Sequence, residues 1–196
     1  MRVRTATSGF TLIEMMVAVA IGALLVFLAA PSFTTFLRNS EIRSTSESIV
    51  NGLRAAKTEA ARQNQRVMFT LAGGNSASWA INLVTDPDTC AGPASPPIQS
   101  YVKEEAGKNS KVTVNPPTKL TVCFDGVGRV MNQGTANDHI LSIDVESTVA
   151  CEARPLRIVV DDASAASPRG LRMCDPNPSL PADDPRYCRD GNDKSC

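Results

Sequence analysis

Histidine is almost absent from this chain, which has a single one, His139, in 196 residues. Zinc sites usually combine histidine and cysteine ligands at short spacing, and none of the six cysteines forms a Cys-x-x-Cys pair. His139 has no evident nucleophile near it in the sequence, so we expect a solvated loop histidine beside Asp138 and not a general base. The sequence therefore predicts no metal, no cofactor and no enzyme.

An excess of charge of one sign is also missing. Twenty basic residues balance twenty acidic ones, and the formal net charge is zero. A chain without net positive charge is poorly suited to coating nucleic acid non-specifically, which leaves at most a local basic patch. Gly126-Val127-Gly128 lacks the third glycine of a dinucleotide-binding fingerprint, so we interpret it as a tight turn and not as a phosphate site.

A long apolar run near the N-terminus is the clearest feature that is present. Residues 15–30 carry no charge, and residues 10–30 would span about 30 Å as a helix at about 1.5 Å per residue. One acid, Glu14, stands at the start of this run. A carboxylate in a bilayer costs roughly 3 kcal/mol on insertion scales, so Glu14 is expected to have a functional partner. Gly9 precedes the apolar run, whereas a secretory signal places its cleavage site after it.

The segment Gly9-Phe10-Thr11-Leu12-Ile13-Glu14, behind a leader with Arg2 and Arg4, resembles the class III signal of type IV prepilins and type II secretion pseudopilins. The resemblance implies that a prepilin peptidase removes residues 1–9 by cutting between Gly9 and Phe10, and then methylates the Phe10 amine. It also implies that Glu14 pairs with the terminal amine of a neighbouring subunit during assembly. The leader arginines favour a cytoplasmic N-terminus, with the bulk of the chain outside the cytoplasm.

Helical periodicity continues beyond Pro31. We therefore expect residues 10–30 to be a transmembrane segment and residues 31–66 to be its amphipathic continuation, with Pro31 kinking the helix and not ending it. Six cations and three acids lie between Arg38 and Arg66, which we interpret as a solvated face. The predicted buried face consists of Ile42, Ile49, Leu53, Ala56 and Ala60.

Residues 67–196 are predicted to form one β-rich head with a Cys- and Pro-rich tail. Short β-type runs separated by turn residues predict strands at 67–71, 79–84, 111–114, 119–124, 140–145 and 156–160. Residues 86–97 are expected to be a loop with little regular structure. The predicted fold class is α+β, with a long N-terminal helix packed on an antiparallel β-sheet head that disulfides stabilise.

Within this head, two segments resemble the GspH/FimT branch of minor pilins and pseudopilins. Residues 53–67 (LRAAKTEAARQNQRV) are similar to the junction between helix and first strand in that branch. Residues 122–130 (VCFDGVGRV) are similar to its strand, glycine turn and strand. Together with the N-terminal signal, these segments cover about half of the chain.

All six cysteines follow the apolar run, and an even number in an exported region is typical of disulfides in the oxidising periplasm. Fifteen complete pairings are possible, and the sequence does not choose among them. We expect Cys174, Cys188 and Cys196 to help hold the Pro-rich tail. The disulfide candidates are Cys90, Cys123, Cys151, Cys174, Cys188 and Cys196.

One C-terminal segment has a predicted role beyond assembly. In DNA-uptake minor pilins of this branch, a Gly-Arg-x-Arg element before a cysteine presents guanidinium groups to DNA. Gly170, Arg172 and Cys174 fit that pattern, Leu171 occupies the first arginine position, and Arg169 is the candidate substitute. Such a loop would bind double-stranded DNA through its phosphates. The alternative is that these arginines pair with local acids.

The leading functional hypothesis is a minor pilin of a type IV pilus, and the alternative is pseudopilin H of a type II secretion system. The implied partners are the prepilin peptidase, other major and minor pilins or pseudopilins, the inner-membrane assembly platform and double-stranded DNA. The implied location is a single-pass inner-membrane protein with a periplasmic head, followed by incorporation into a pilus or pseudopilus.

Overall fold

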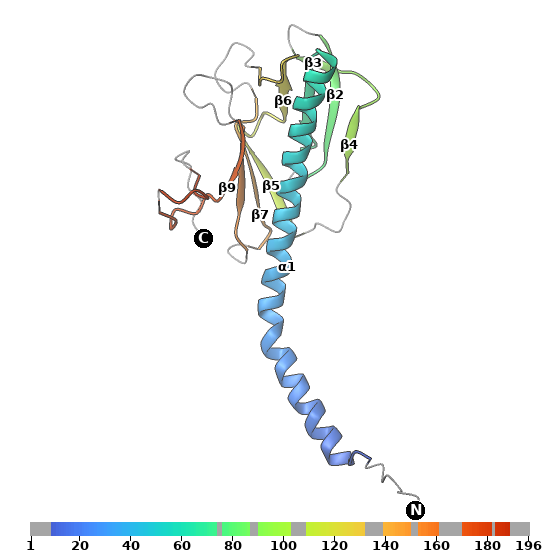
Figure 1. The fold of residues 1–196 in the computed structure, drawn as a ribbon, viewed down its shortest axis with the longest axis vertical. Coiled ribbons are helices and arrows are strands. Elements are labelled where there is room, and N and C mark those ends of the chain that lie inside the picture. Colours follow the sequence, from blue (N-terminus) through green and yellow to red (C-terminus); the bar gives the residue numbers. More distant parts are fainter. Residues whose placement is uncertain are drawn as a thin grey trace, which may run out of the picture. The chain divides into compact units, whose positions relative to one another are not determined.

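The computed structural model describes residues 9–73, 76–86, 90–102, 109–131, 139–149, 153–160, 170–181 and 183–188. The chain divides into two compact units, residues 1–37 and residues 38–196. One helix, α1 (Leu12–Gln63), supplies residues to both units (Figure 1).

The first unit is an exposed apolar helix. Thr11 begins it as an N-cap, because its side-chain oxygen accepts a hydrogen bond from the Glu14 backbone N–H at 3.3 Å. Every side chain described between Leu12 and Leu37 is exposed, and α1 contains an 18-residue window of mean hydropathy 2.6. By length and composition this helix can cross a membrane. The helix continues through Pro31 as predicted, and a kink there stays a prediction.

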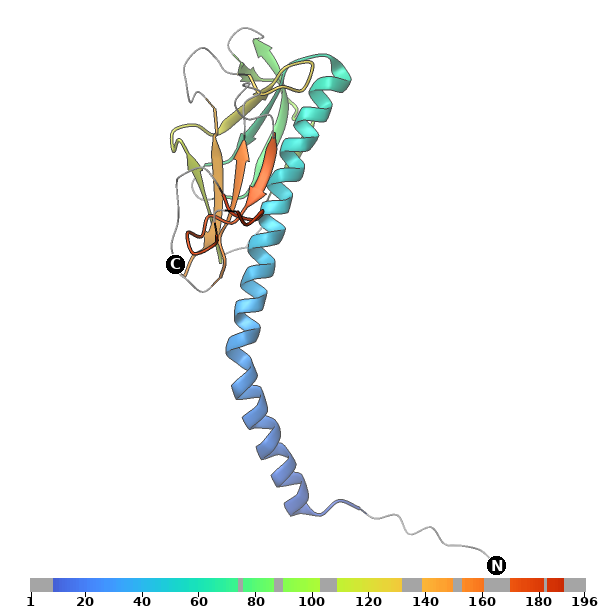
Figure 2. The same ribbon diagram turned by 60° about the vertical axis from the view of Figure 1, so that its left-hand side comes forward.

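In the second unit, the rest of α1 packs on a β-rich head. The predicted apolar face is confirmed, since Ile42, Ile49, Leu53, Ala56 and Ala60 are at most 1% exposed. α1 ends at Gln63, and Asn64 adopts the left-handed conformation (φ 50°) that commonly follows a helix. In the view of Figure 2 the strands lie on one side of this part of the helix.

The strands form two antiparallel sheets. In the first, the order is β3-β2-β1-β6, and β4 also pairs with β2. In the second, the order is β5-β7-β8-β9. The strands of the first sheet are β1 (Val67–Leu71), β2 (Trp79–Asp86), β3 (Ala91–Pro93), β4 (Gln99–Tyr101) and β6 (Thr121–Phe124); those of the second are β5 (Ser110–Asn115), β7 (Ser142–Ser147), β8 (Leu156–Val160) and β9 (Leu171–Cys174).

The predicted α+β fold is confirmed, with differences in detail. Each predicted strand overlaps an observed one, and those at 67–71 and 156–160 match to the residue. The loop expected at 86–97 contains β3, and β4 and β9 were also not predicted. These three strands have three or four residues each, too few for an alternating pattern to stand out, and their pairing with β2 and β8 defines them.

One core joins the helix to both sheets. Phe69 and Trp79 of the first sheet and Ile143 and Ile158 of the second belong to the same buried cluster as α1. Gly52 permits a close approach of α1 to β2, because a Cβ there would lie 2.8 Å from the Trp79 ring. The Trp79 indole N–H donates to the Ser48 hydroxyl at 3.3 Å, which satisfies its only polar group.

Candidate functional site

The N-terminal motif combines exposed apolar side chains with one carboxylate. Phe10 is 79% exposed, and Glu14 lies in the first turn of α1, where the helix dipole favours an acid. Between Leu12 and Leu37, Glu14 is the only ionisable residue. This arrangement can bind a cationic partner at the start of an apolar helix. The processing roles of Gly9 and Phe10 and the pairing of Glu14 stay predictions.

Four of the six cysteines form two disulfides. Cys90 bonds to Cys123 of β6, and Met68 of β1 packs against them in a small cluster. Cys174 at the end of β9 bonds to Cys188. The other two candidates, Cys151 and Cys196, lie outside the described residues.

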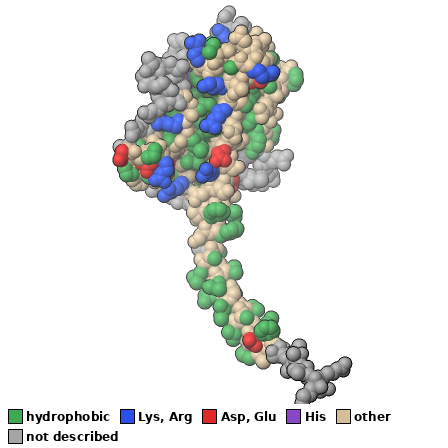
Figure 3. Space-filling view, viewed as in Figure 1, with side chains coloured by type: hydrophobic (Ala, Val, Ile, Leu, Met, Phe, Trp, Pro, Cys, Tyr) green, Lys and Arg blue, Asp and Glu red, His purple; other side chains and the backbone are tan. Residues whose placement is uncertain are grey.

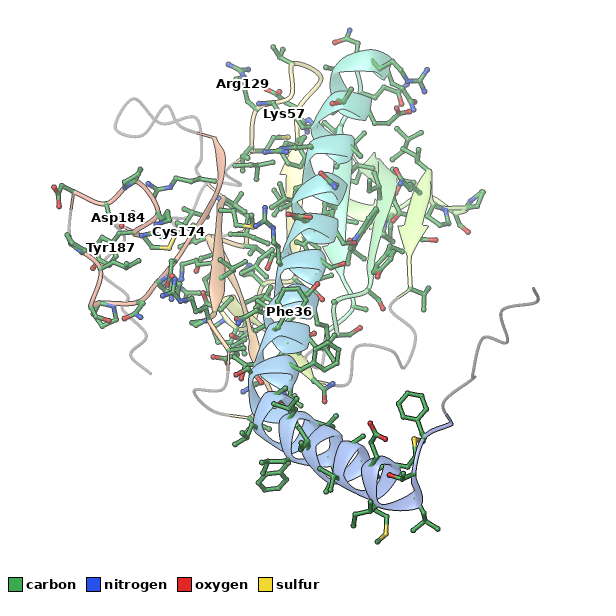
Figure 4. The ribbon with its side chains drawn as sticks, turned by 60° about the horizontal axis from the view of Figure 1, so that its bottom comes forward. Phe36, Lys57, Arg129, Cys174, Asp184 and Tyr187 are labelled. Atoms are coloured by element: carbon green, nitrogen blue, oxygen red, sulfur yellow. A yellow bond between two sulfur atoms is a disulfide. The ribbon has the colours of Figure 1, made fainter. Side chains whose placement is uncertain are left out.

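The second disulfide holds a folded tail beside β9. Asp175 and Tyr187 form a parallel bridge, and their neighbours are tied by hydrogen bonds from Asp175 N to Arg186 O (2.6 Å) and from Cys188 N to Asp175 O (3.0 Å). Hydrogen bonds from the Arg186 side chain and backbone lower the pKa of Asp184 to about 2. Figure 4 shows Cys174, Asp184 and Tyr187 in this segment. Of the cysteines predicted to hold the tail, Cys174 and Cys188 thus form a disulfide with each other.

The loop position predicted for Arg172 is wrong, whereas its role in DNA binding stays a prediction. Arg172 lies in strand β9, opposite Val159 of β8, and is half-buried. Gly170 precedes the strand with φ +63°, a conformation that favours glycine. Arg169, the other candidate, lies outside the described residues. The position is a strand because Leu171–Cys174 completes the edge of the second sheet.

A buried ion pair was missed in the sequence. Arg157 of β8 and Asp144 of β7 are cross-strand partners, and their side chains are 3% and 10% exposed. Arg157 Nε donates to Asp144 Oδ1 at 2.6 Å and Arg157 Nη2 donates to Oδ2 at 3.1 Å, a bidentate pair. Asp144 and Arg157 each interrupt an apolar strand. These opposite charges are the feature of the sequence that could have indicated a buried ion pair. The pairing required knowledge that β7 and β8 are neighbours.

His139 is also placed differently from the prediction. It is 4% exposed and therefore buried, whereas a solvated loop position was expected. Its neighbour Ile140 is fully buried and joins the first sheet through a hydrogen bond from Ile140 N to Thr121 O. Asp138, the residue beside it, lies outside the described residues. His139 lies in the interior because it directly precedes an apolar run that begins with the buried Ile140.

Basic side chains gather on the face shown in Figure 3, over α1 and the strands beside it. The predicted solvated face of α1 has its charges partly paired: Arg43 binds Glu47 at 2.8 Å, and Arg62 binds Glu59. Hydrogen bonds from the Arg62 and Gln63 side chains lower the pKa of Glu59 to about 2.

The turn after β6 adds a third pair to this face. Asp125 accepts hydrogen bonds from Val127 N (3.0 Å) and Arg129 N (2.8 Å) and binds the Arg129 guanidinium at 2.8 Å. Burial raises the pKa of Asp125, but the hydrogen bonds from the Arg129 backbone and side chain and from Val127 outweigh it and hold that pKa below its usual value. Gly128 has φ +81° in this turn, which is the tight turn expected from the sequence.

Two family models match this chain. A prokaryotic N-terminal methylation motif matches residues 4–30. The family described as type II transport protein GspH matches residues 45–164, which is more than half of the chain.

Two known proteins are similar to it. The type IV major pilin protein PilE1 of Neisseria gonorrhoeae is 33% identical over 112 residues. These residues are 56% of this chain and 57% of PilE1, so the chain spans a little over half the length of this relative. The crystal structure of the type IV minor pilin FimU of Pseudomonas aeruginosa has a TM-score of 0.48 at 11% identity, over 71% of this chain and 91% of FimU.

Proposed function

Because this chain belongs to the GspH family of type IV pilin-like proteins, we propose that it is a minor pilin of a type IV pilus. The observation that carries the proposal is an exposed apolar helix from Leu12 to Leu37 whose only ionisable residue is Glu14. Such a surface requires apolar surroundings, which a membrane supplies before assembly and neighbouring subunits supply afterwards. The family and fold are those of structural proteins, and we propose no catalytic activity.

The N-terminus is proposed to be processed before assembly. A prepilin peptidase would cut between Gly9 and Phe10, remove residues 1–9 and methylate Phe10, as the matching methylation motif supports. Residues 10–30 would then remain in the inner membrane and residues 67–196 would form the head in the periplasm. Other pilins and the inner-membrane assembly platform are the proposed partners.

The choice of a pilus over a secretion pseudopilus is also a proposal. Similarity to a type IV major pilin supports the pilus, and the two disulfides of the head are suited to exposure at the cell surface. The family description as a type II transport protein supports the alternative, pseudopilin H of a type II secretion system.

A clean deletion strain tests this choice. We expect sheared surface pili to be lost or strongly reduced, while secreted exoproteins in the same culture stay at the wild-type amount. Complementation with the full chain is the control and should restore the pili. Normal pili together with failed secretion would assign the chain to a type II secretion system instead.

DNA binding by Arg169 and Arg172 is a second candidate function. The supporting observation is that Arg172, at the edge of the second sheet, makes no ion pair with the residues that the structure describes. We expect the full chain in detergent to retard a short DNA duplex, with an affinity that falls as salt rises. The double variant Arg169→Ala, Arg172→Ala should lose this binding. Retention of the gel shift in that variant would exclude these arginines.

A further inference from the structure

Two exposed cations in the C-terminal part of α1 have no carboxylate partner among the described residues. Arg54 and Lys57 are exposed, and neither makes an ion pair with any residue in the described ranges. They are three residues apart on one helix, so their side chains are neighbours. By contrast, Arg43 and Arg62, nearer the two ends of this half, bind Glu47 and Glu59. Arg54 and Lys57 are therefore two adjacent cations, unpaired among the described residues, between two paired ones along α1.

The turn after β6, which contains Gly128, packs against Lys57. A Cβ on Gly128 would lie 3.0 Å from Lys57 Cγ and 3.2 Å from the Lys57 carbonyl oxygen, so the turn backbone contacts the apolar stem of Lys57. Arg129, the next residue, is neutralised by Asp125. Figure 4 labels Arg129 and Lys57. A lysine whose stem already packs on a turn loses less side-chain entropy when its ammonium binds a partner.

We propose that Arg54 and Lys57 form a docking site for an acidic cluster on the head of a neighbouring subunit in the filament. The proposal rests on the proposed function, because it requires assembly. Carboxylates at fixed positions suit the planar guanidinium of Arg54, which can bind one of them in a bidentate manner. Complementary charges between subunits set partner choice and register more than affinity, which is what the placement of a minor subunit requires.

A protein partner fits better than DNA at this site. Each neutralised phosphate contributes a slope of only about −0.9 to the salt dependence of DNA binding, and useful affinity takes many such contacts. Arg54 and Lys57 supply only two such contacts. An acidic protein surface needs only these two contacts in addition to the apolar contacts of assembly.

Zero-length crosslinking in sheared filaments tests the contact. A carbodiimide joins the Lys57 amine to a touching carboxylate as an amide, and the water lost converts the reagent to its urea. We expect a crosslinked species that contains this chain and one other subunit. Lys57→Arg keeps the charge but removes the crosslinkable amine, so it should assemble normally and lose that species. The same species in Lys57→Arg filaments would overturn the proposal.

Charge reversal tests the role in assembly. Arg54→Glu with Lys57→Glu is expected to lower the amount in sheared filaments about tenfold relative to the membrane fraction, with normal leader removal. The matched control, Arg43→Glu with Arg62→Glu, changes the net charge equally and should assemble at near the wild-type amount.

Equal loss in both variants would overturn the site in favour of a general charge effect. Normal assembly of Arg54→Glu, Lys57→Glu would also overturn it, and if the same variant fails to retard a duplex that the wild-type chain retards, the surface binds DNA instead. Absence of the wild-type chain from sheared filaments would refute the proposed assembly function itself. This outcome distinguishes failure of the proposed function from failure of the proposed docking site.

Discussion

Replacing Asp144 with alanine is expected to lower the free energy of unfolding of the head by about 3–5 kcal/mol, because it removes the carboxylate that binds the buried Arg157 guanidinium through two hydrogen bonds. The pair lies between two central strands, β7 and β8, and both side chains are almost fully covered. Water can therefore not replace the lost carboxylate without opening the sheet. The penalty is the cost of a buried charge that has lost this carboxylate, which exceeds the net contribution of the intact pair.

Trp79 allows this loss to be measured directly. It is the only tryptophan, it is buried, and its ring lies 5.8 Å from that of Phe69, so its fluorescence reports the packing of the core. Urea unfolding of the full chain in detergent would compare Asp144→Ala with the wild type. The control is Asp144→Leu with Arg157→Met, which removes both charges and should regain most of the stability. A loss below about 1 kcal/mol in Asp144→Ala would mean that Arg157 is satisfied without this carboxylate.

The ion pair shares a face of the sheet with the tail disulfide. Cys174 of β9 stands directly opposite Arg157 of β8, and its partner Cys188 is fully buried. Val159 packs with both cysteines on this face. The disulfide thus places the tail against the side of the sheet that does not face α1, where it excludes water from apolar and charged groups alike.

Periodic features of the sequence predicted the main parts of the fold. The face of α1 from Ile42 to Ala60 repeats at helical spacing, and Val67–Leu71 and Leu156–Val160 are dense in β-branched and apolar side chains. The short strand Gln99–Tyr101 has three exposed residues and no pattern of its own. It is ordered by its pairing with β2 and by the stacking of Tyr101 on Trp79 at 5.9 Å, which are contacts that a single sequence does not display.

Features that depend on non-local pairing could not be predicted in this way. Asp144 and Arg157 are 13 residues apart, and only the register of β7 and β8 brings them together. Arg172 followed a loop-like pattern of glycine and arginine, but hydrogen bonding to β8 made it a strand residue. The N-terminal signal has the opposite character, because its proposed role is recognition by other proteins. Its geometry in a single chain is simply that of a capped, exposed helix.

Replacing Glu14 with alanine is expected to leave removal of residues 1–9 intact and to lower incorporation into filaments by at least about tenfold, equivalent to 1.4 kcal/mol. A carboxylate costs up to roughly 3 kcal/mol in a membrane, so alanine should insert more easily than the native residue. If incorporation nevertheless falls, the acid must gain more from a partner than it costs. The terminal amine of a neighbouring Phe10 would be that partner.

Two comparisons make the experiment decisive, with the chain quantified in the membrane and in sheared filaments. Gly9→Val should block cleavage and leave the longer precursor in the membrane, which separates a processing defect from an assembly defect. Glu14→Gln keeps the shape and polarity of the side chain but removes its charge, and it should fail in assembly as Glu14→Ala does. Normal incorporation of both uncharged variants would refute ionic pairing. The remaining role of Glu14 would be its favourable interaction with the helix dipole.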